Sequence, residues 1–202
     1  MKREDRQNLK ALAQELCRLE YEEIGARIQH LDTDALIELF NSRFRKVGDA
    51  AFACLRKQPD GEQAVIDAIL QNRLTRRDSK VRGANFLEFK GRSHPEAIRA
   101  YFHLLDDKNE EVADNALFGI VLSQNPSDLA RVRKKRDSAE PNTWMHHQLC
   151  SAVRALEDGN PFLYTGGYSA DQAEELWHIK NARKKKEAAN QALDVLRAAP
   201  EE

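Results

Sequence analysis

The sequence predicts an all-α protein, a right-handed α-α superhelix of about four helix pairs with helical caps. Two apolar stripes at helical spacing occupy Pro95–Gln124, on either side of the polar turn Asp106–Asn109. The position that opens the second stripe recurs at intervals of about 31 to 34 residues. It is occupied by Val47, Val81, Val112 and Met145, which we expect to be buried. One helix pair leaves an apolar edge that a stacked neighbour would cover, whereas the alternative is an ordinary helical bundle with uneven loops.

The chain is expected to form a single domain that begins with a capping helix within residues 1–31. Residues 4–30 are predicted to form one long helix, because a leucine stripe at helical spacing continues into further apolar residues. The stripe consists of Leu9, Leu12, Leu16, Leu19, Ile24, Ile28 and Leu31. A helix of this kind can cover the open edge of the first pair.

Turn and cap signals divide residues 32–158 into the four helix pairs. Asp32–Asp34 and Asn125–Asp128 offer N-caps, and Gln58–Gly61 is a strong turn. The expected pairs are 36–40 with 47–55, 65–70 with 81–89, 97–105 with 112–121, and a helix from 126 with 143–158. The helix after Asn125 has few apolar residues and is expected at an exposed edge. Residues 159–202 are expected to hold a loop, a last helix from about Ala170 that packs Trp177, and a tail.

One short pattern within the repeats has a counterpart in a known family. An Asp in the turn is followed by Val-Arg and a small residue, at Asp78, Val81, Arg82 and Ala84, and in part again at Asp107, Val112 and Ala116. This pattern resembles the second helix of HEAT repeats, over about residues 32–158. The resemblance implies an α-solenoid whose second helices line a concave face. It also implies Asp–Arg ladders between neighbours, but only Arg82 stands in the Arg place, so a continuous ladder is not expected.

Composition favours a cytoplasmic protein without membrane contact. The net charge is −1 over 202 residues, so no global attraction to nucleic acid or to an anionic membrane follows. No apolar run approaches a membrane span, and the N-terminal stretch MKREDRQNLK lacks the apolar core of a secretory signal. Cys17, Cys54 and Cys150 are odd in number and far apart, which indicates reduced and mostly packed thiols.

Motifs of catalysis and of cofactor binding are missing from the sequence. Gly166-Gly167 is an isolated pair rather than a phosphate-binding loop, and no Cys-x-x-Cys occurs. His146 and His147 lie near Cys150 on one helix, but a zinc site needs three or four ligands. We therefore expect no metal and no cofactor, and the sequence favours a protein that is not an enzyme.

Charge is distributed in bands along the chain. Residues 41–92 and 131–136 are rich in Lys and Arg, whereas residues 93–130 and 137–180 are rich in Asp and Glu. Non-specific nucleic-acid binding usually needs a continuous basic track that displaces counterions. Alternating bands are more typical of a protein partner with its own mixed surface.

The concave face of a HEAT-like array indicates candidate binding residues. If the repeat valines face the core, the fifth position after each falls on one row, at Phe52, Phe86, Leu117 and Cys150. These four side chains are apolar or weakly polar, and we call them the soft row. Such a row with charged positions on either side has the composition of a protein-binding groove, unless it packs between neighbouring repeats instead. The predicted partner-binding residues are Arg82, Phe86, Lys90, Asp114, Trp144, His147 and Arg154.

The sequence thus predicts a non-catalytic solenoid that grips one partner protein in its concave face. A more specific version is a bacterial immunity or inhibitor protein. The alternative is a nucleic-acid-binding HEAT-like protein, including an enzyme similar to the alkylpurine DNA glycosylases built from such repeats. Those glycosylases use a cleft with Trp and Asp, but here only the repeat matches, so no catalytic residue is carried over. A lyase or chaperone for a bound pigment is a third class.

Overall fold

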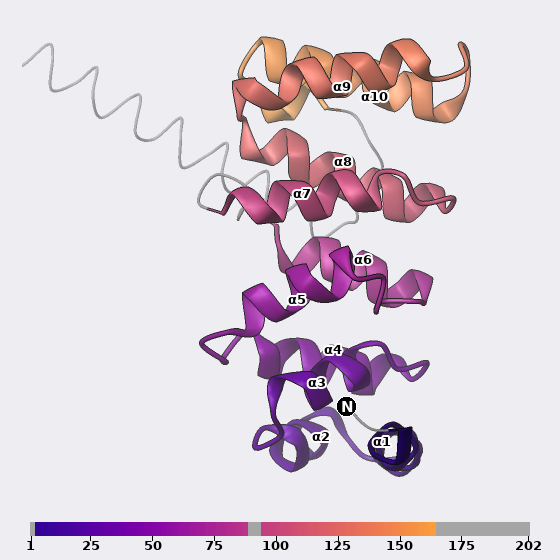
Figure 1. Cartoon of the computed structure of the whole chain (residues 1–202), viewed down its shortest axis with the longest axis vertical. Helices are drawn as coiled ribbons and strands as arrows, with labels where there is room; N and C mark the ends of the chain where they lie inside the picture. The colour runs from indigo at the N-terminus through magenta and orange to yellow at the C-terminus, as the bar shows by residue number, and fades with distance from the viewer. Residues whose placement is uncertain (1–2, 89–93, 165–202) are drawn as a thin grey trace, which may run out of the picture. The chain divides into compact units, whose positions relative to one another are not determined.

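The computed structural model describes residues 3–88 and 94–164, except for the side chains of Arg3, Glu4 and Phe162. These two ranges contain ten α-helices and one short 3-10 helix, and no strand (Figure 1). The all-α prediction is therefore confirmed for them. Lys90, the helix expected from about Ala170 with Trp177, and the tail lie outside the described residues.

The N-terminal segment forms two helices, so the prediction of one long helix over residues 4–30 is wrong. Helix α1 (Arg3–Leu16) ends in a tight turn, in which the Leu19 N–H donates to the carbonyl of Leu16 at 3.0 Å. Helix α2 (Tyr21–Ile28) begins after Glu20, whose backbone is extended and whose N–H donates to the Glu23 carboxylate at 3.3 Å. This capping box starts a new helix and overrides the continuous stripe.

Eight further helices follow as four pairs, which agrees with the predicted number. The pairs are α3 (Thr33–Phe40) with α4 (Arg45–Leu55), α5 (Gly61–Leu70) with α6 (Arg77–Phe86), α7 (Pro95–Leu104) with α8 (Glu110–Ser123), and α9 (Pro126–Ser138) with α10 (Trp144–Glu157). A 3-10 turn, η1 (Pro161–Leu163), packs on α10. Side chains of Asp32, Asn109 and Thr143 accept hydrogen bonds from first-turn N–H groups, so local cap chemistry sets several helix starts.

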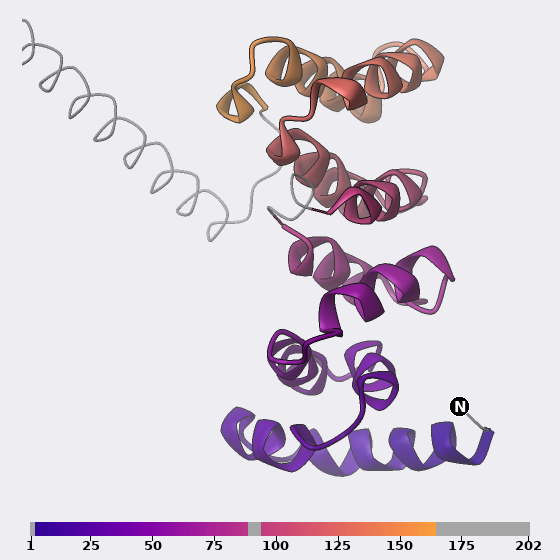
Figure 2. The same cartoon turned by 60° about the vertical axis from the view of Figure 1, so that its left-hand side comes forward.

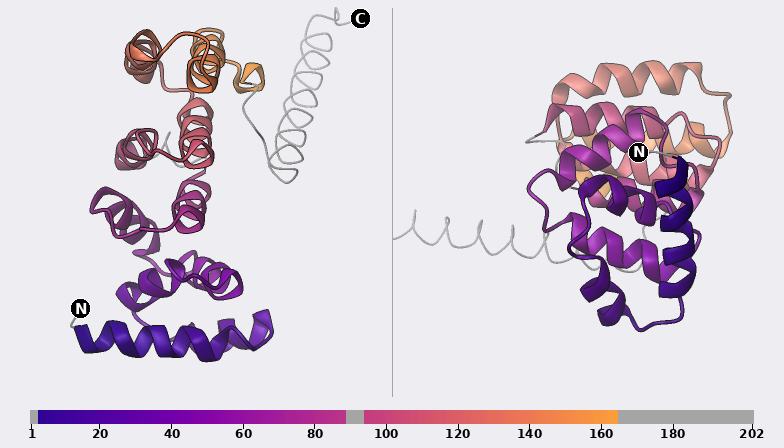
Figure 3. Two further views of the ribbon diagram at one scale, coloured as in Figure 1. Left: turned by 90° about the vertical axis from the view of Figure 1, so that its right-hand side faces the viewer. Right: turned by 60° about the horizontal axis from the view of Figure 1, so that its bottom comes forward.

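The helices of the described unit lie in two layers. First helices contact first helices, α1 on α3, α3 on α5 and α5 on α7, while second helices contact second helices from α2 through α4, α6 and α8 to α10. Figures 2 and 3 show the pairs following one another along the chain, with the two layers side by side. Helix α1 contacts the first layer through α3 and α2 contacts the second layer through α4, so the N-terminal segment adds one helix to each layer.

The core lies between the two layers, and the repeat positions contribute to it unequally. Val47 and Val112 are fully buried, as predicted. Val81 and Met145 are only half-buried, so the prediction is wrong for these two. Helix α6 turns Ser79, Gly83 and Ala84 to the core instead, and Met145 lies in the first turn of α10, at the end of its buried stripe.

Helix α9 is the most weakly buried of the paired helices, which confirms its predicted exposed position. It buries only Asp128 and Val132, and it reaches α7 through polar contacts. The guanidinium carbon of Arg131 lies 3.5 Å from the ring centroid of Phe102, and Lys135 forms an ion pair with Asp106. The three thiols are free, with Cys54 buried, Cys17 half-buried and Cys150 exposed, so only one of them is packed as expected.

Candidate functional site

A groove of about 500 Å³ opens on the second layer between α4 and α6. Its walls come from four successive second helices, α2, α4, α6 and α8. The lining residues are Tyr21, Arg45, Asp49, Phe52, Arg77, Asp78, Val81, Arg82, Asn85 and Glu111.

The floor of the groove is apolar and partly aromatic. The half-buried Phe52 ring stacks on Phe40 with centroids 6.3 Å apart and meets Phe86 edge-to-face at 5.2 Å. At the groove's edge, Tyr21 is 40% exposed, and its hydroxyl donates to the carbonyl of Asp49 at 3.2 Å. Among the described residues, Tyr21 is the one exposed large hydrophobic side chain. An accessible Tyr beside a supported Phe can anchor an apolar side chain of a ligand.

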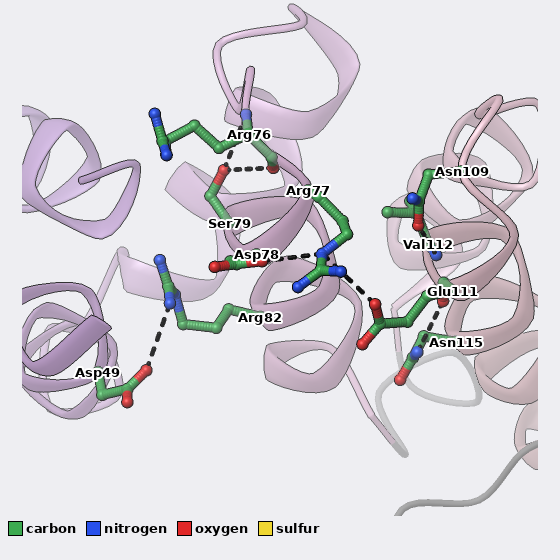
Figure 4. Close-up of polar contacts among 10 residues, drawn as sticks. All are labelled: Asp49, Arg76, Arg77, Asp78, Ser79, Arg82, Asn109, Glu111, Val112 and Asn115. Atoms are coloured by element: carbon green, nitrogen blue, oxygen red, sulfur yellow. Dashed lines mark hydrogen bonds and ion pairs between the residues drawn. The ribbon is translucent and has the colours of Figure 1, made fainter. Parts of the chain in front are cut away.

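The rim of the groove consists of charges that neutralise one another (Figure 4). Asp49 lies 3.5 Å from Arg45 and 3.4 Å from Arg82. Arg77 lies 2.9 Å from Asp78 and 3.4 Å from Glu111. The Arg82–Asp49 pair joins α6 to α4, and the Arg77–Glu111 pair joins α6 to α8. Neighbouring repeats are therefore linked by ion pairs on this face, although only the first link uses the Arg predicted for a ladder.

Arg82 is held inside the protein more than the sequence suggested. Its side chain is 12% exposed, and its Nη2 donates to the carbonyl of Phe40 at 2.9 Å. The guanidinium lies against Gly48, where a Cβ would come within 2.4 Å of Nη2. Burial lowers the pKa of Arg82 from its usual value, and the nearby Asp49 and Asp78 oppose that shift. Arg82 therefore connects α4 to α6, and its side chain is mostly buried rather than exposed to a partner.

Replacing Arg82 by Met is expected to destabilise the protein by about 2 kcal/mol, because the Phe40 carbonyl and Asp49 lose a charged donor. Urea unfolding followed by circular dichroism would measure this. Arg45→Met is the matched control, since Arg45 faces the same Asp49 with a side chain that is 89% exposed. The control should change stability by less than about 0.5 kcal/mol. Equal losses in both variants would contradict this role of Arg82.

The structure brings together only part of the predicted partner-binding set. Phe86 is 7% exposed and its ring packs edge-to-face against Phe52. Phe86 therefore holds Phe52 in place without lining the groove itself. Asp114 is buried and accepts a hydrogen bond from the Tyr164 hydroxyl at 2.5 Å. Trp144 is half-buried, while His147 and Arg154 are exposed, and all three belong to α10 rather than to the groove. Whether they contact a partner stays a prediction.

The predicted soft row is not a continuous exposed surface. Leu117 is fully buried and Phe86 nearly so, whereas Phe52 is half-buried and Cys150 is exposed. The reason is the stacking of second helices, because α4 contacts α6 and α6 contacts α8 along their sides. The interpretation of this row as packing between repeats therefore holds for its two middle members.

Sequence reasoning missed several residues of the groove, above all Tyr21, Arg45 and Arg77. Tyr21 lies inside the single helix predicted over residues 4–30, so the periodicity gives no sign that it stands at the start of α2. The spacing Glu20-x-x-Glu23, now seen as a capping box, was the available signal of a new helix.

The described residues contain no group of three or more His, Cys, Asp or Glu side chains that could bind a metal ion. His146 and Cys150 share a face as expected, with Nδ1 and Sγ 3.9 Å apart, and they offer two ligands. Within residues 3–88 and 94–164, no helix has the length and apolar character needed to cross a membrane. Comparison with family models, curated proteins and solved structures found no match to this chain.

Proposed function

We propose that this protein is a HEAT-like α-solenoid that binds a segment of one partner protein in the groove between α4 and α6. The observation that carries the proposal is the composition of this groove. An aromatic floor of Tyr21 and Phe52 lies between the paired charges around Asp49 and those around Arg77. An apolar centre with aromatic and Arg side chains inside a polar rim is typical of protein interfaces.

Helix stacking supports the solenoid part of the proposal. Each second helix from α2 to α8 contacts the next second helix along the chain, so successive pairs cover one another's edges. This is the arrangement expected of repeats that cannot bury their apolar faces alone. We infer that the pairs follow the right-handed α-α superhelix of HEAT-like proteins, with the second helices on its concave side.

The charge pattern supports a protein as the ligand rather than nucleic acid in this groove. Arg45, Arg77 and Arg82 each have a carboxylate within 3.5 Å, so the groove has no excess of cations to displace counterions from phosphates. The segment we propose carries one apolar anchor for the floor, flanked by charges of both signs that meet the exposed Arg45, Arg77 and Glu111.

We place this activity in the cytoplasm, where the free thiols of Cys17, Cys54 and Cys150 stay reduced. In a more specific form of the proposal, the bound segment belongs to the active cleft of an enzyme. The protein would then act as an immunity or inhibitor protein, by occlusion and without chemistry of its own.

The proposal is tested with Tyr21→Ala and Arg77→Glu, two exposed groove positions, and with Arg154→Glu as the control on α10. Each tagged variant is expressed in the native cell, and captured proteins are quantified by mass spectrometry. One protein should be enriched by the wild type and the control but lost from both groove variants. With that partner purified, calorimetry should show affinity at least about 10-fold weaker for each groove variant.

Melting curves must be close to wild type for every variant in this comparison. Undiminished capture by both groove variants would refute the site. A partner lost on Arg154→Glu alone would move the binding face to α10, where the sequence also predicted contacts.

A further inference from the structure

A second cleft, of about 540 Å³, lies among the N-terminal helices, with residues of α1 and α3 in its lining. It is bounded by α1, by the end of α3, and by the loops that precede α4 and α6. The lining residues are Arg6, Leu9, Lys10, Ala13, Gln14, Glu38, Asn41, Ser42, Arg43, Phe44, Thr75 and Arg76. None of these residues lines the groove proposed above for a protein partner.

Among the residues that line this cleft, cationic side chains outnumber carboxylates. Glu38 is the single carboxylate among the lining residues, and it lies 3.6 Å from Arg6 and 3.8 Å from Arg73. Lys10, Arg43 and Arg76 are exposed and form no ion pair within the described part of the chain. Figure 4 shows the Arg76 side chain pointing away from the ion pairs of Arg77. The cleft therefore carries uncompensated positive charge, unlike the groove between α4 and α6.

One wall of the cleft is fixed in advance by Asn41. Its side-chain amide donates to the carbonyl of Arg73 at 3.1 Å, and its oxygen accepts from the N–H of Thr75 at 3.1 Å and from the Ser79 hydroxyl at 2.7 Å. These bonds hold the loop that carries Arg76 against the end of α3. A preformed wall lowers the entropic cost of binding a ligand.

Backbone groups add to the positive potential. Phe44 is the N-cap residue of α4 and Arg76 that of α6, where the Ser79 hydroxyl accepts a hydrogen bond from the Arg76 N–H at 3.3 Å. Both residues line the cleft, so two helix starts, each with partial positive charge, border it. Helix starts alone define no site, but here they reinforce three unpaired cationic side chains.

The cleft also has an apolar part suited to a ring. The guanidinium carbon of Arg43 lies 4.8 Å from the centroid of the Phe44 ring, and Leu9 and Ala13 face the same cleft. Nucleobases stack on aromatic rings and on guanidinium planes. The cleft volume is within the range of small-molecule sites.

We propose that this cleft binds a nucleoside phosphate, with the phosphates on Lys10 and Arg76 and the base against the Arg43–Phe44 stack. Phosphate oxygens accept charge-assisted hydrogen bonds from these cations, and the apolar wall excludes water around the base. The same chemistry is offered by a free nucleotide and by one nucleotide within a single strand. Because the cleft and the protein-binding groove share no lining residue, this inference is independent of the function proposed above.

The test is calorimetric titration of the full-length protein with ATP, with pyrophosphate, and with a single-stranded oligonucleotide of about 12 nucleotides. Lys10→Glu and Arg76→Glu should each weaken ATP binding by about 10-fold or more. Lys57→Glu and Lys108→Glu are the controls, because both lysines are exposed, have no ion pair within the described residues and lie outside the cleft. The controls should change ATP affinity by less than about 2-fold.

The probes separate the two sources of the ligand. ATP binding equal to that of the oligonucleotide would identify a free nucleotide, whereas much tighter oligonucleotide binding that falls steeply with salt would identify a strand. Pyrophosphate binding as tight as ATP would refute the role of the Arg43–Phe44 stack. ATP titrations without heat at about 1 mM, or equal losses in the cleft and control variants, would refute the site itself.

Discussion

Replacing Val112 by Asp is expected to destabilise the protein by about 4 kcal/mol or more. Val112 is fully buried in the first turn of α8, a helix that contacts α6, α7 and α10. A carboxylate at this position would lose its hydration without gaining a charged partner at the centre of three packed helices. Urea unfolding followed by circular dichroism would measure the loss, and the unfolding midpoint should fall without a change in slope.

Val81→Asp is the matched control for this prediction, because Val81 holds the same place in the preceding repeat. Val81 is half-buried and lines the groove beside Arg77 and Arg82, so an Asp there keeps contact with water and with cations. We expect it to cost less than about 1 kcal/mol. A loss as large as that of Val112→Asp would show that the two repeat positions are equivalent in the folded protein, against the burial described above.

Gly119→Ala is expected to destabilise the protein by about 3 kcal/mol or more, although Gly to Ala within a helix usually stabilises. A Cβ at position 119 would lie 2.2 Å from Cζ of Tyr101. The Tyr101 ring is fully buried, and its hydroxyl donates to the carbonyl of Ala84 at 3.2 Å. The ring cannot move away without breaking that bond and displacing α7 from α8. Thermal unfolding monitored by circular dichroism would detect the loss.

Gly25→Ala is the control for the glycine, since no atom lies within 4 Å of a Cβ at this position in α2. Here the ordinary helix preference should apply, and stability should stay equal or rise by up to about 1 kcal/mol. Should Gly119→Ala behave like Gly25→Ala, the close packing of Tyr101 on α8 would be incorrect. The pair therefore tests tertiary packing apart from helix propensity.

The repeat pattern could be predicted from sequence because it rests on local rules. An apolar stripe at helical spacing defines each helix, and cap residues such as Asp32, Asn109 and Thr143 start helices wherever they occur in a favourable position. Pro95 and Pro126 begin α7 and α9 for the same local reason. The all-α class and the four pairs from α3 to α10 follow from these signals.

Local rules also explain the error in the N-terminal segment. A four-residue turn between Leu16 and Tyr21 left the apolar residues nearly in phase, so periodicity alone could not detect the break. The Glu20–Glu23 capping box was present in the sequence, but its effect competes with helix continuation, and the packing of α1 on α3 and α2 on α4 favours the break. The groove's edge at Tyr21 depends on that break.

Sequence patterns were sufficient to predict the helices from α3 to α10, because each helix depends on interactions between residues a few positions apart. Only the tertiary structure decided which side of each second helix stays accessible, because neighbouring helices bury Leu117 and Phe86 but leave Phe52 and Val81 in a groove. The position of Arg82 likewise depends on Gly48, a residue of the preceding pair whose missing side chain makes room for the guanidinium. The basic cleft has the same origin: Lys10, Arg43 and Arg76 are far apart in sequence, and the stacking of α1, α3 and the loops before α4 and α6 brings them together.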